Sequence, residues 1–203
     1  MAYFPMFIEL KGKSCIVVGG GAVAYRKISI LLQYGADVTA IAETFTEQLE
    51  RMRENPRLHL LKKEIKEVCQ IESFAVQNKE IALAICATNN RKLNQEIALF
   101  FKEKQVPVNV VDQKELCTFL FPAVVNKENV SIGITTEGKS PMVSSYLREQ
   151  IEEFIDEELL EFLEEIGEYR AWLKEHVKEE SKRRECLREK MEDWKRKRKS
   201  SHL

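Results

Sequence analysis

The 203-residue chain has almost no net charge and no long hydrophobic run. It carries 32 basic and 33 acidic side chains, so the formal net charge is −1, which argues against nucleic-acid binding driven by overall charge. No apolar stretch approaches the roughly 20 residues that a membrane-spanning helix needs. The N-terminus also lacks the basic segment and small-residue cleavage site of a secretory signal. With 44% hydrophobic residues, the composition favours a globular protein with no nucleic-acid or membrane partner.

Cysteine and histidine are scarce and scattered. The five cysteines are odd in number and none is in C-x-x-C spacing, so the sequence predicts no disulfide framework. This usage is typical of a reducing compartment, and we expect a cytoplasmic protein. The three histidines, His59, His176 and His202, are far apart, and with these cysteines they form no recognisable metal site.

The most informative stretch runs from Ser14 to Lys27. Its apolar, β-branched start predicts a buried strand, and Gly19, Gly21 and Ala24 then match G-x-G-x-x-G/A. In that pattern Gly19 permits a tight turn, Gly21 lets a pyrophosphate approach the backbone, and Ala24 allows close packing of helix and strand. A helix over 23–34 then offers its N-terminus to phosphate groups. The pattern predicts a dinucleotide site; the alternative is a plain β-turn-α unit.

An acidic residue follows the second predicted strand, 37–41. Glu43 lies 19 residues after Ala24, where a carboxylate accepts hydrogen bonds from a ribose 2′-OH and repels a 2′-phosphate. This favours NAD over NADP. Asp37 competes for the same role and weakens that preference.

Alternation of short apolar runs with helical patterns continues to residue 112. We expect helices over 46–54 and 91–103 and strands over 58–61, 81–87 and 106–111, which gives an α/β fold with a parallel sheet. Such sheets bind ligands at the carboxyl ends of their strands, where Thr88, Asn89 and Asp112 fall. Asp112 is a catalytic candidate by position, although a turn or a cap also explains an aspartate there.

The alternation stops after Asp112. Residues 117–121 and 130–134 predict an antiparallel strand pair, and Ser140-Pro141 predicts a helix start. An apolar stripe continues from there to Ile155, and one solution for covering it is a homodimer. The remaining chain predicts charged helices, acidic first and then basic, with a break expected at Gly167. The basic run is interpreted as a solvated helix end, with a polyanion contact or pairing with the acidic stretch as alternatives.

Read together, several motifs closely resemble the siroheme synthase family, in its precorrin-2 dehydrogenase / sirohydrochlorin ferrochelatase module. The resemblance covers about residues 3–155. Its motifs are Gly-Gly-Gly-Ala-Val-Ala-Tyr-Arg-Lys (19–27), Ala-Thr-Asn-Asn-Arg-Lys-Leu-Asn (87–94), Asn-Val-Val-Asp (109–112), Cys-Thr-Phe-Leu-Phe-Pro-Ala (117–123) and Ile-Thr-Thr-Glu-Gly-Lys-Ser-Pro (134–141).

The resemblance implies a fold and an activity. The fold is a Rossmann-type domain, here 1–113, a small α+β dimerisation domain, 114–150, and a helical C-terminal region, 151–203. The activity is oxidation of the tetrapyrrole precorrin-2 by NAD⁺ to sirohydrochlorin, and some members also insert Fe²⁺. For this chain the sequence does not decide between iron and cobalt as the inserted metal.

The resemblance also implies site residues. Asp112 corresponds to the proposed general acid or base, cofactor residues fall at Ala22, Val23, Glu43 and Thr44, and Thr136 and Ser140 lie in a loop near the substrate. Glu137 departs from the family by replacing a glycine of that loop, which puts the loop geometry and chelatase competence in question. Two non-enzymatic hypotheses remain open: an NAD(H)-sensing regulatory dimer and a tetrapyrrole carrier.

Overall fold

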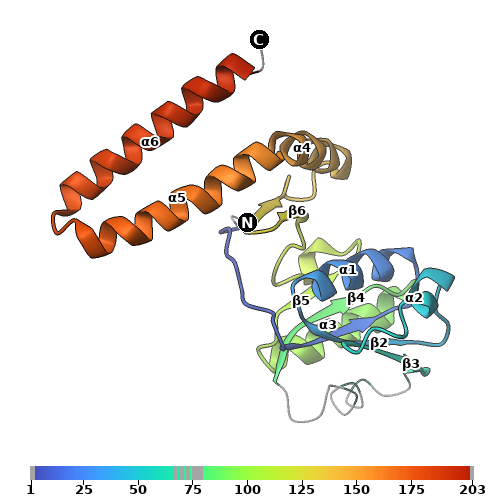
Figure 1. The fold of residues 1–203 in the computed structure, drawn as a ribbon. Helices are drawn as coiled ribbons and strands as arrows, with labels where there is room; N and C mark the ends of the chain where they lie inside the picture. Colours follow the sequence, from blue (N-terminus) through green and yellow to red (C-terminus); the bar gives the residue numbers. More distant parts are fainter. Residues whose placement is uncertain (1–2, 66–67, 69–70, 72–73, 75–79, 202–203) are drawn as a thin grey trace. The chain divides into compact units, whose positions relative to one another are not determined.

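The computed structural model describes residues 3–65, 68, 71, 74 and 80–201, and within them it separates two compact units (Figure 1). The first contains residues 1–122 and 135–141, and the second contains 123–134 and 142–203. The boundaries expected at 113/114 and 150/151 stay predictions. Among the described residues no helix combines the length and apolar character needed to cross a membrane.

The first unit is built on a parallel five-stranded sheet in the order β3-β2-β1-β4-β5. Its strands are β1 (Ser14–Val18), β2 (Asp37–Ala42), β3 (Leu58–Lys62), β4 (Ile81–Cys86) and β5 (Val108–Val110). The order reverses between β1 and β4, which places a topological switch point at the carboxyl ends of these two strands. The fold class predicted from the sequence is therefore confirmed.

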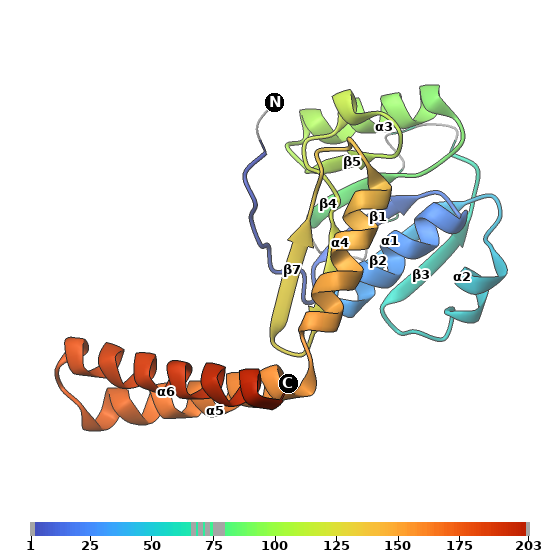
Figure 2. The same ribbon diagram turned by 90° about the horizontal axis from the view of Figure 1, so that it is seen from above.

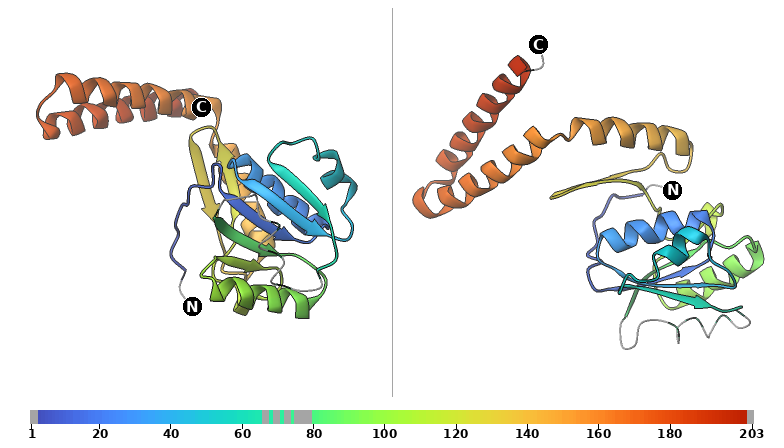
Figure 3. Two further views of the ribbon diagram at one scale, coloured as in Figure 1. Left: turned by 90° about the horizontal axis from the view of Figure 1, so that it is seen from below. Right: turned by 45° about the vertical axis from the view of Figure 1, so that its right-hand side comes forward.

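Helices cover both faces of this sheet (Figure 3). On one face α1 (Ala22–Gln33) and α2 (Glu47–Arg51) pack through Ala24, Ile28 and Leu49. On the other, α3 (Arg91–Glu103) buries Ile97 and Phe101. Because both faces are covered, the central strands are mostly apolar, and all five residues of β1 are buried, including the polar Ser14.

Predicted and observed elements differ mainly at their ends. The helix α3 has the predicted bounds, whereas α2 stops at Arg51 instead of about Glu54. The strand β5 is shorter than the predicted 106–111, because Pro107 lacks an N–H group for the sheet and the chain turns at 111–112. The ambiguous segment 64–77 lies largely outside the described residues.

The predicted strand at 117–121 is wrong. The two-stranded antiparallel sheet exists, but it pairs β6 (Ala123–Lys127) with β7 (Val130–Ile134). Residues 117–119 instead follow the edge of β5 and bond to it partly through side chains. Thr118 donates its N–H to the Val108 oxygen at 2.9 Å, and its hydroxyl accepts from the Val108 N–H at 2.8 Å.

The second unit continues into three helices: α4 (Pro141–Phe154), α5 (Glu157–His176) and α6 (Glu180–Ser201). The predicted start at Ser140-Pro141 is confirmed. Lys127 of β6 donates to the Glu152 and Ile155 carbonyl oxygens at 2.6 and 2.7 Å, which places a cation at the C-terminal end of α4. The predicted break at Gly167 is wrong, because α5 passes through it; the chain bends instead at Asp156, which caps α5.

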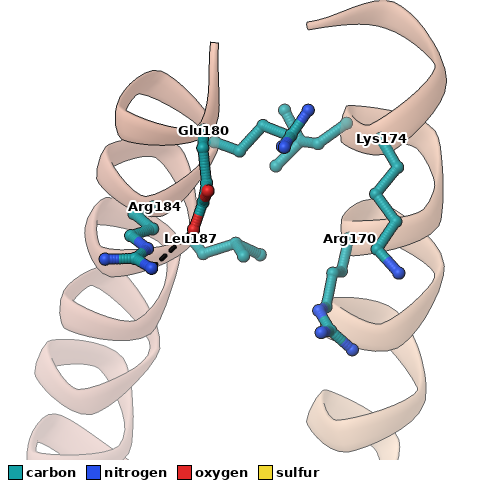
Figure 4. A pocket seen from close by; sticks show the side chains of 7 residues that line it. Arg170, Lys174, Glu180, Arg184 and Leu187 are labelled. Atoms are coloured by element: carbon teal, nitrogen blue, oxygen red, sulfur yellow. Dashed lines mark hydrogen bonds and ion pairs between the residues drawn. The ribbon is translucent and has the colours of Figure 1, made fainter. Parts of the chain in front are cut away.

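The helices α5 and α6 lie side by side as a hairpin (Figure 2). Phe162 and Trp194 stack across it with ring centroids 4.6 Å apart. Lys190 pairs with Glu165 and Arg198 with Asp156, both at 2.8 Å. Part of the basic stretch therefore pairs with the acidic stretch, the alternative that the sequence left open. Near the turn of the hairpin, a pocket is lined mostly by basic side chains, including Arg170, Lys174 and Arg184 (Figure 4).

Candidate active site at the carboxyl edge of the sheet

Four strand ends meet at one edge of the first unit. The segments that follow β1, β2, β4 and β5 carry, respectively, the glycine turn, Glu43, Thr88 and Asp112. Backbone hydrogen bonds join neighbouring segments beyond the strands: Gly19 N to Ile41 O at 2.9 Å, Ala87 N to Val18 O at 2.7 Å, and Val111 N to Cys86 O at 2.9 Å. These bonds hold the segments in register around the switch point. The predicted cofactor and catalytic residues are thus brought to one edge.

The three glycines of the turn have different reasons to lack a side chain. Gly19 has φ 137°, and a Cβ there would lie 2.4 Å from the Ala87 carbonyl oxygen. A Cβ on Gly20 would lie 2.0 Å from the Thr44 carbonyl oxygen. A Cβ on Gly21 would meet no protein atom within 4 Å, so this position is open to a ligand. The role of Gly20, which the motif leaves variable, was missed by the sequence analysis.

The N-terminus of α1 is suited to a phosphate group. Gly21 is the N-cap and offers no side-chain bond, and no acidic residue occurs in the first turn. Ala22 is exposed and Val23 half-buried, and their N–H groups belong to the first helical turn, which has no intrahelical acceptor for them. Ala24 is fully buried, as the motif requires for close packing. The chain therefore fits the pyrophosphate of a dinucleotide here.

Glu43 and Thr44 are both exposed just after β2. Asp37, the competing acid, is the first residue of β2 and pairs in register with Ser14, at the amino end of the sheet. It therefore lies at the opposite edge from the glycine turn. Of the two acids, Glu43 alone is at the edge where the predicted cofactor residues gather.

Thr88 is held by a buried asparagine that the sequence analysis did not single out. The Asn94 side chain accepts from the Thr88 hydroxyl at 2.7 Å and donates to the Thr88 carbonyl oxygen at 2.9 Å. Asn90 caps α3 by accepting from the Leu93 N–H at 3.1 Å. Asn89 is exposed between them. The spacing of Asn90 and Asn94, one helical turn apart at a helix start, was the available signal.

Asp112 is exposed on the turn that follows β5, with φ 58°. This left-handed conformation is uncommon for residues other than glycine, and asparagine and aspartate tolerate it best. The Cys117 sulfur closes the same turn. It accepts from the Val110 N–H at 3.1 Å, and its thiol faces the Val110 oxygen at 3.3 Å and the Gln113 oxygen at 3.5 Å.

The loop that contains Thr136 and Ser140 belongs to the same unit as Asp112. The Thr136 hydroxyl donates to the Ser140 oxygen at 3.0 Å and accepts from the Ser140 N–H at 3.2 Å. Glu137 has φ 54°, the region a glycine would occupy at no steric cost. Lys114, two residues after Asp112, donates from Nζ to the Glu137 carbonyl oxygen. With Glu137 in this conformation, the loop is closed and lies beside the Asp112 segment.

Two kinds of buried titratable group lie in the same unit. Burial raises the pKa of the Cys15 and Cys86 thiols to about 12, so at neutral pH both stay protonated. They act as small apolar side chains in the core. Lys27 of α1 is different, because its Nζ donates to Asn109 Oδ1 of β5 at 3.1 Å and lies 4.1 Å from the centre of the Phe121 ring. Burial lowers the pKa of this amine to about 8. The sequence analysis gave Lys27 no role.

Comparison with known proteins identifies a nucleotide-binding family for this chain. Residues 6–123 match the model of a protein family described as "Putative NAD(P)-binding". The siroheme synthase of Vesicomyosocius okutanii subsp. Calyptogena okutanii is 33% identical over 174 residues, which cover 86% of this chain and 36% of the relative. Siroheme synthase 1 of Yersinia enterocolitica is 32% identical over 184 residues, covering 91% and 37%. The chain spans little more than a third of these relatives' length.

A solved structure is similar over nearly the whole chain. A protein titled "SirC, precorrin-2 dehydrogenase" superposes with a TM-score of 0.70 at 25% sequence identity, covering 92% of this chain and 88% of its own. The matched family model covers more than half of the residues. The chain belongs to this NAD(P)-binding family and is related to the siroheme synthases over most of its length, as its motifs predicted.

Proposed function

We propose that this chain catalyses the oxidation of precorrin-2 to sirohydrochlorin with NAD⁺ as the oxidant. The observation that carries the proposal is the exposed Asp112 carboxylate at the same sheet edge as the glycine turn and Glu43. The similar solved structure bears the name of this activity. The reaction balances as precorrin-2 plus NAD⁺ giving sirohydrochlorin, NADH and a proton.

Each part of the site has a task in this reaction. When bound at this edge, a nicotinamide would supply the hydride acceptor for the reaction. The first turn of α1 holds the pyrophosphate, and the open space at Gly21 lets it approach the backbone. Asp112 accepts the proton that leaves the tetrapyrrole. The loop with Thr136 and Ser140 contacts the substrate, and Thr88 and Asn89 contact the cofactor.

The preference for NAD over NADP is part of the proposal. Glu43 lies where a carboxylate accepts from the ribose 2′-OH and repels a 2′-phosphate. Asp37 cannot take that role from the opposite edge of the sheet. We therefore expect NAD⁺ as the working cofactor, held by Glu43 and Thr44.

We also propose that the protein is a cytoplasmic homodimer. The helix α4 buries no residue within its own chain, and large apolar side chains on it are exposed, among them Met142, Tyr146 and Leu147. A second copy of the chain would cover them. The four described cysteines, Cys15, Cys86, Cys117 and Cys186, are free thiols, which fits a reducing compartment.

The direct test is an anaerobic assay of the purified chain with enzymatically generated precorrin-2 and NAD⁺. The proposal predicts that NADH and sirohydrochlorin form in equal amounts, with sirohydrochlorin followed by its absorption spectrum. Adding Fe²⁺ or Co²⁺ as substrates to the same cuvette then tests metal insertion. Binding of NAD⁺ without either product would contradict the proposal and favour the sensor, whereas binding of sirohydrochlorin without NADH formation would favour the carrier.

A further inference from the structure

Lys27 connects two elements that the sequence keeps far apart. It lies in the first half of α1, the helix that follows the glycine turn. Its partner Asn109 is the central residue of β5. The ammonium donates to Asn109 Oδ1 at 3.1 Å and lies 4.1 Å from the centre of the Phe121 ring. Taking a lysine amine out of water is costly, and these two contacts offset part of that cost.

Asn109 passes the contact on to the segment that follows Asp112. Its side chain is 6% exposed, and its amide nitrogen donates to the Phe119 oxygen at 3.1 Å and to the Cys117 sulfur at 3.6 Å. An amide that accepts on one side and donates on the other has a fixed orientation. The bond from Lys27 therefore fixes which face of Asn109 meets Cys117.

Cys117 completes the connection. Its sulfur lies within 3.1 to 3.5 Å of backbone atoms of Val110 and Gln113, the residues that enclose Asp112. Asp112 itself sits at φ 58°, a conformation that the surrounding contacts have to maintain. Each contact in the series from Lys27 to this turn lies within the first unit.

We propose that Lys27 is a positioning residue for Asp112, acting through Asn109 and Cys117 on the turn that presents the carboxylate. The inference rests on the proposed function, because it needs Asp112 to be the proton acceptor. It assigns no substrate contact to Lys27. Removing the amine leaves Asn109 without its donor and loosens the turn, so the carboxylate is presented in the wrong place.

The test uses Lys27→Met, which keeps the length and apolar stem of the side chain, and Lys27→Arg, which keeps a donor. Lys104→Met is the control, because Lys104 also lies over a ring, Phe100 at 5.1 Å, but follows α3 at the amino edge of the sheet. Two quantities are measured in each full-length variant. One is the pair kcat and KM for precorrin-2 oxidation; the other is the alkylation rate of Cys117 by iodoacetamide, followed by mass spectrometry of its peptide.

We expect Lys27→Met to lower kcat about 10- to 100-fold with KM for NAD⁺ and precorrin-2 nearly unchanged, since a small displacement of a reacting group has effects of that size. Cys117 should alkylate several-fold faster in the same variant. Lys27→Arg should restore most of kcat and the slow alkylation, and Lys104→Met should match the wild type in both.

Other results overturn the inference in distinguishable ways. Unchanged alkylation in Lys27→Met would mean that Lys27 does not hold the Cys117 turn. Faster alkylation with unchanged kcat would mean that the turn does not position Asp112. A raised KM for precorrin-2 with unchanged kcat would make Lys27 a substrate-binding residue. An inactive wild type would contradict the proposed function, while the alkylation result would still report on the contact series.

Discussion

Gly20 lies against Thr44 so closely that a Cβ on the glycine would be 2.0 Å from the Thr44 carbonyl oxygen. The approach joins the turn after β1 to the segment after β2, and the Thr46 N–H donates to the Gly20 oxygen at 2.9 Å. Both sides of the contact are backbone, so neither can move without moving its segment. The glycine turn and the segment that carries Glu43 thus form one structural piece.

Gly20→Ala should therefore weaken cofactor binding and lower stability together. The methyl group would displace the Glu43 segment, and overpacking of this kind costs about 1–3 kcal/mol. Urea unfolding and NAD⁺ titration by fluorescence measure the two effects.

The control for this change is Gly167→Ala. A Cβ at Gly167 meets nothing within 4 Å, and the residue lies inside α5. We expect that variant to gain about 0.5–1 kcal/mol and to bind NAD⁺ as the wild type does. Equal NAD⁺ affinity in Gly20→Ala and the wild type would refute the coupling of the two segments.

Glu43→Arg should shift cofactor preference toward NADP⁺. The change removes the carboxylate that repels a 2′-phosphate and adds a cation that attracts it. Asp37→Asn is the matched control, because Asp37 begins the same strand at the other end of the sheet. The ratio of kcat/KM for NAD⁺ and NADP⁺ should fall at least tenfold in the first variant and stay constant in the second. An unchanged ratio in Glu43→Arg would remove Glu43 from the ribose site.

Glu137→Gly should leave stability within about 1 kcal/mol of the wild type. Relief of the left-handed conformation at φ 54° offsets the larger entropy of glycine in the unfolded chain. Glu128→Gly makes the same backbone change at φ 47° in the β6–β7 turn and serves as control. If the Glu137 carboxylate faces the anionic substrate, only Glu137→Gly lowers KM for precorrin-2. An equal KM in both variants would show that the carboxylate does not meet the substrate.

Lys27 should make part of the stability depend on pH. Its folded pKa, about 8, lies below the 10.5 of a free lysine, so between these values the unfolded chain binds more protons and the free energy of unfolding rises with pH. Cys15 and Cys86 act oppositely: their folded pKa of about 12 exceeds the ordinary 9.0, so stability is lost as pH rises through that window.

The difference in unfolding free energy between the wild type and Lys27→Met isolates the lysine. We expect that difference to shift in favour of the wild type by about 1–3 kcal/mol from pH 7.5 to pH 10. Urea unfolding under reducing conditions at both pH values measures it. A difference that stays constant over this range would mean that the amine is not desolvated in the fold.

Local patterns were enough to predict the sheet, its helices and the glycine turn. The buried run after Ser14, the motif spacing to Ala24 and the helical pattern from Arg91 each depend on residues close in sequence. Tertiary contacts were not predictable in the same way. The residues 117–121 look like a strand, yet Thr118 uses its side chain to bond β5, and nothing local indicates that.

The residues of the candidate site likewise fall into those predicted from local sequence and those that depend on tertiary contacts. Glu43, Thr88 and Asp112 were proposed because each follows a strand of the predicted parallel sheet, a position that sequence alternation reveals. Lys27 and Asn109 are 82 residues apart, so their bond was not visible before the fold was known. Gly20 was missed because the reason for its size is the Thr44 backbone, not its place in the motif.

The central claim is that Asp112 accepts the proton during precorrin-2 oxidation, and Asp112→Asn tests it most directly. Asparagine tolerates the left-handed conformation at this position and keeps the side-chain shape, so the turn is retained while the basic group is lost. Glu115→Gln, an exposed carboxylate three residues on, is the control. The measurement is kcat for NADH formation with saturating NAD⁺ and precorrin-2. The account predicts a loss of about 100-fold or more in Asp112→Asn, with unchanged NAD⁺ affinity and a fully active control; wild-type turnover in Asp112→Asn would contradict it.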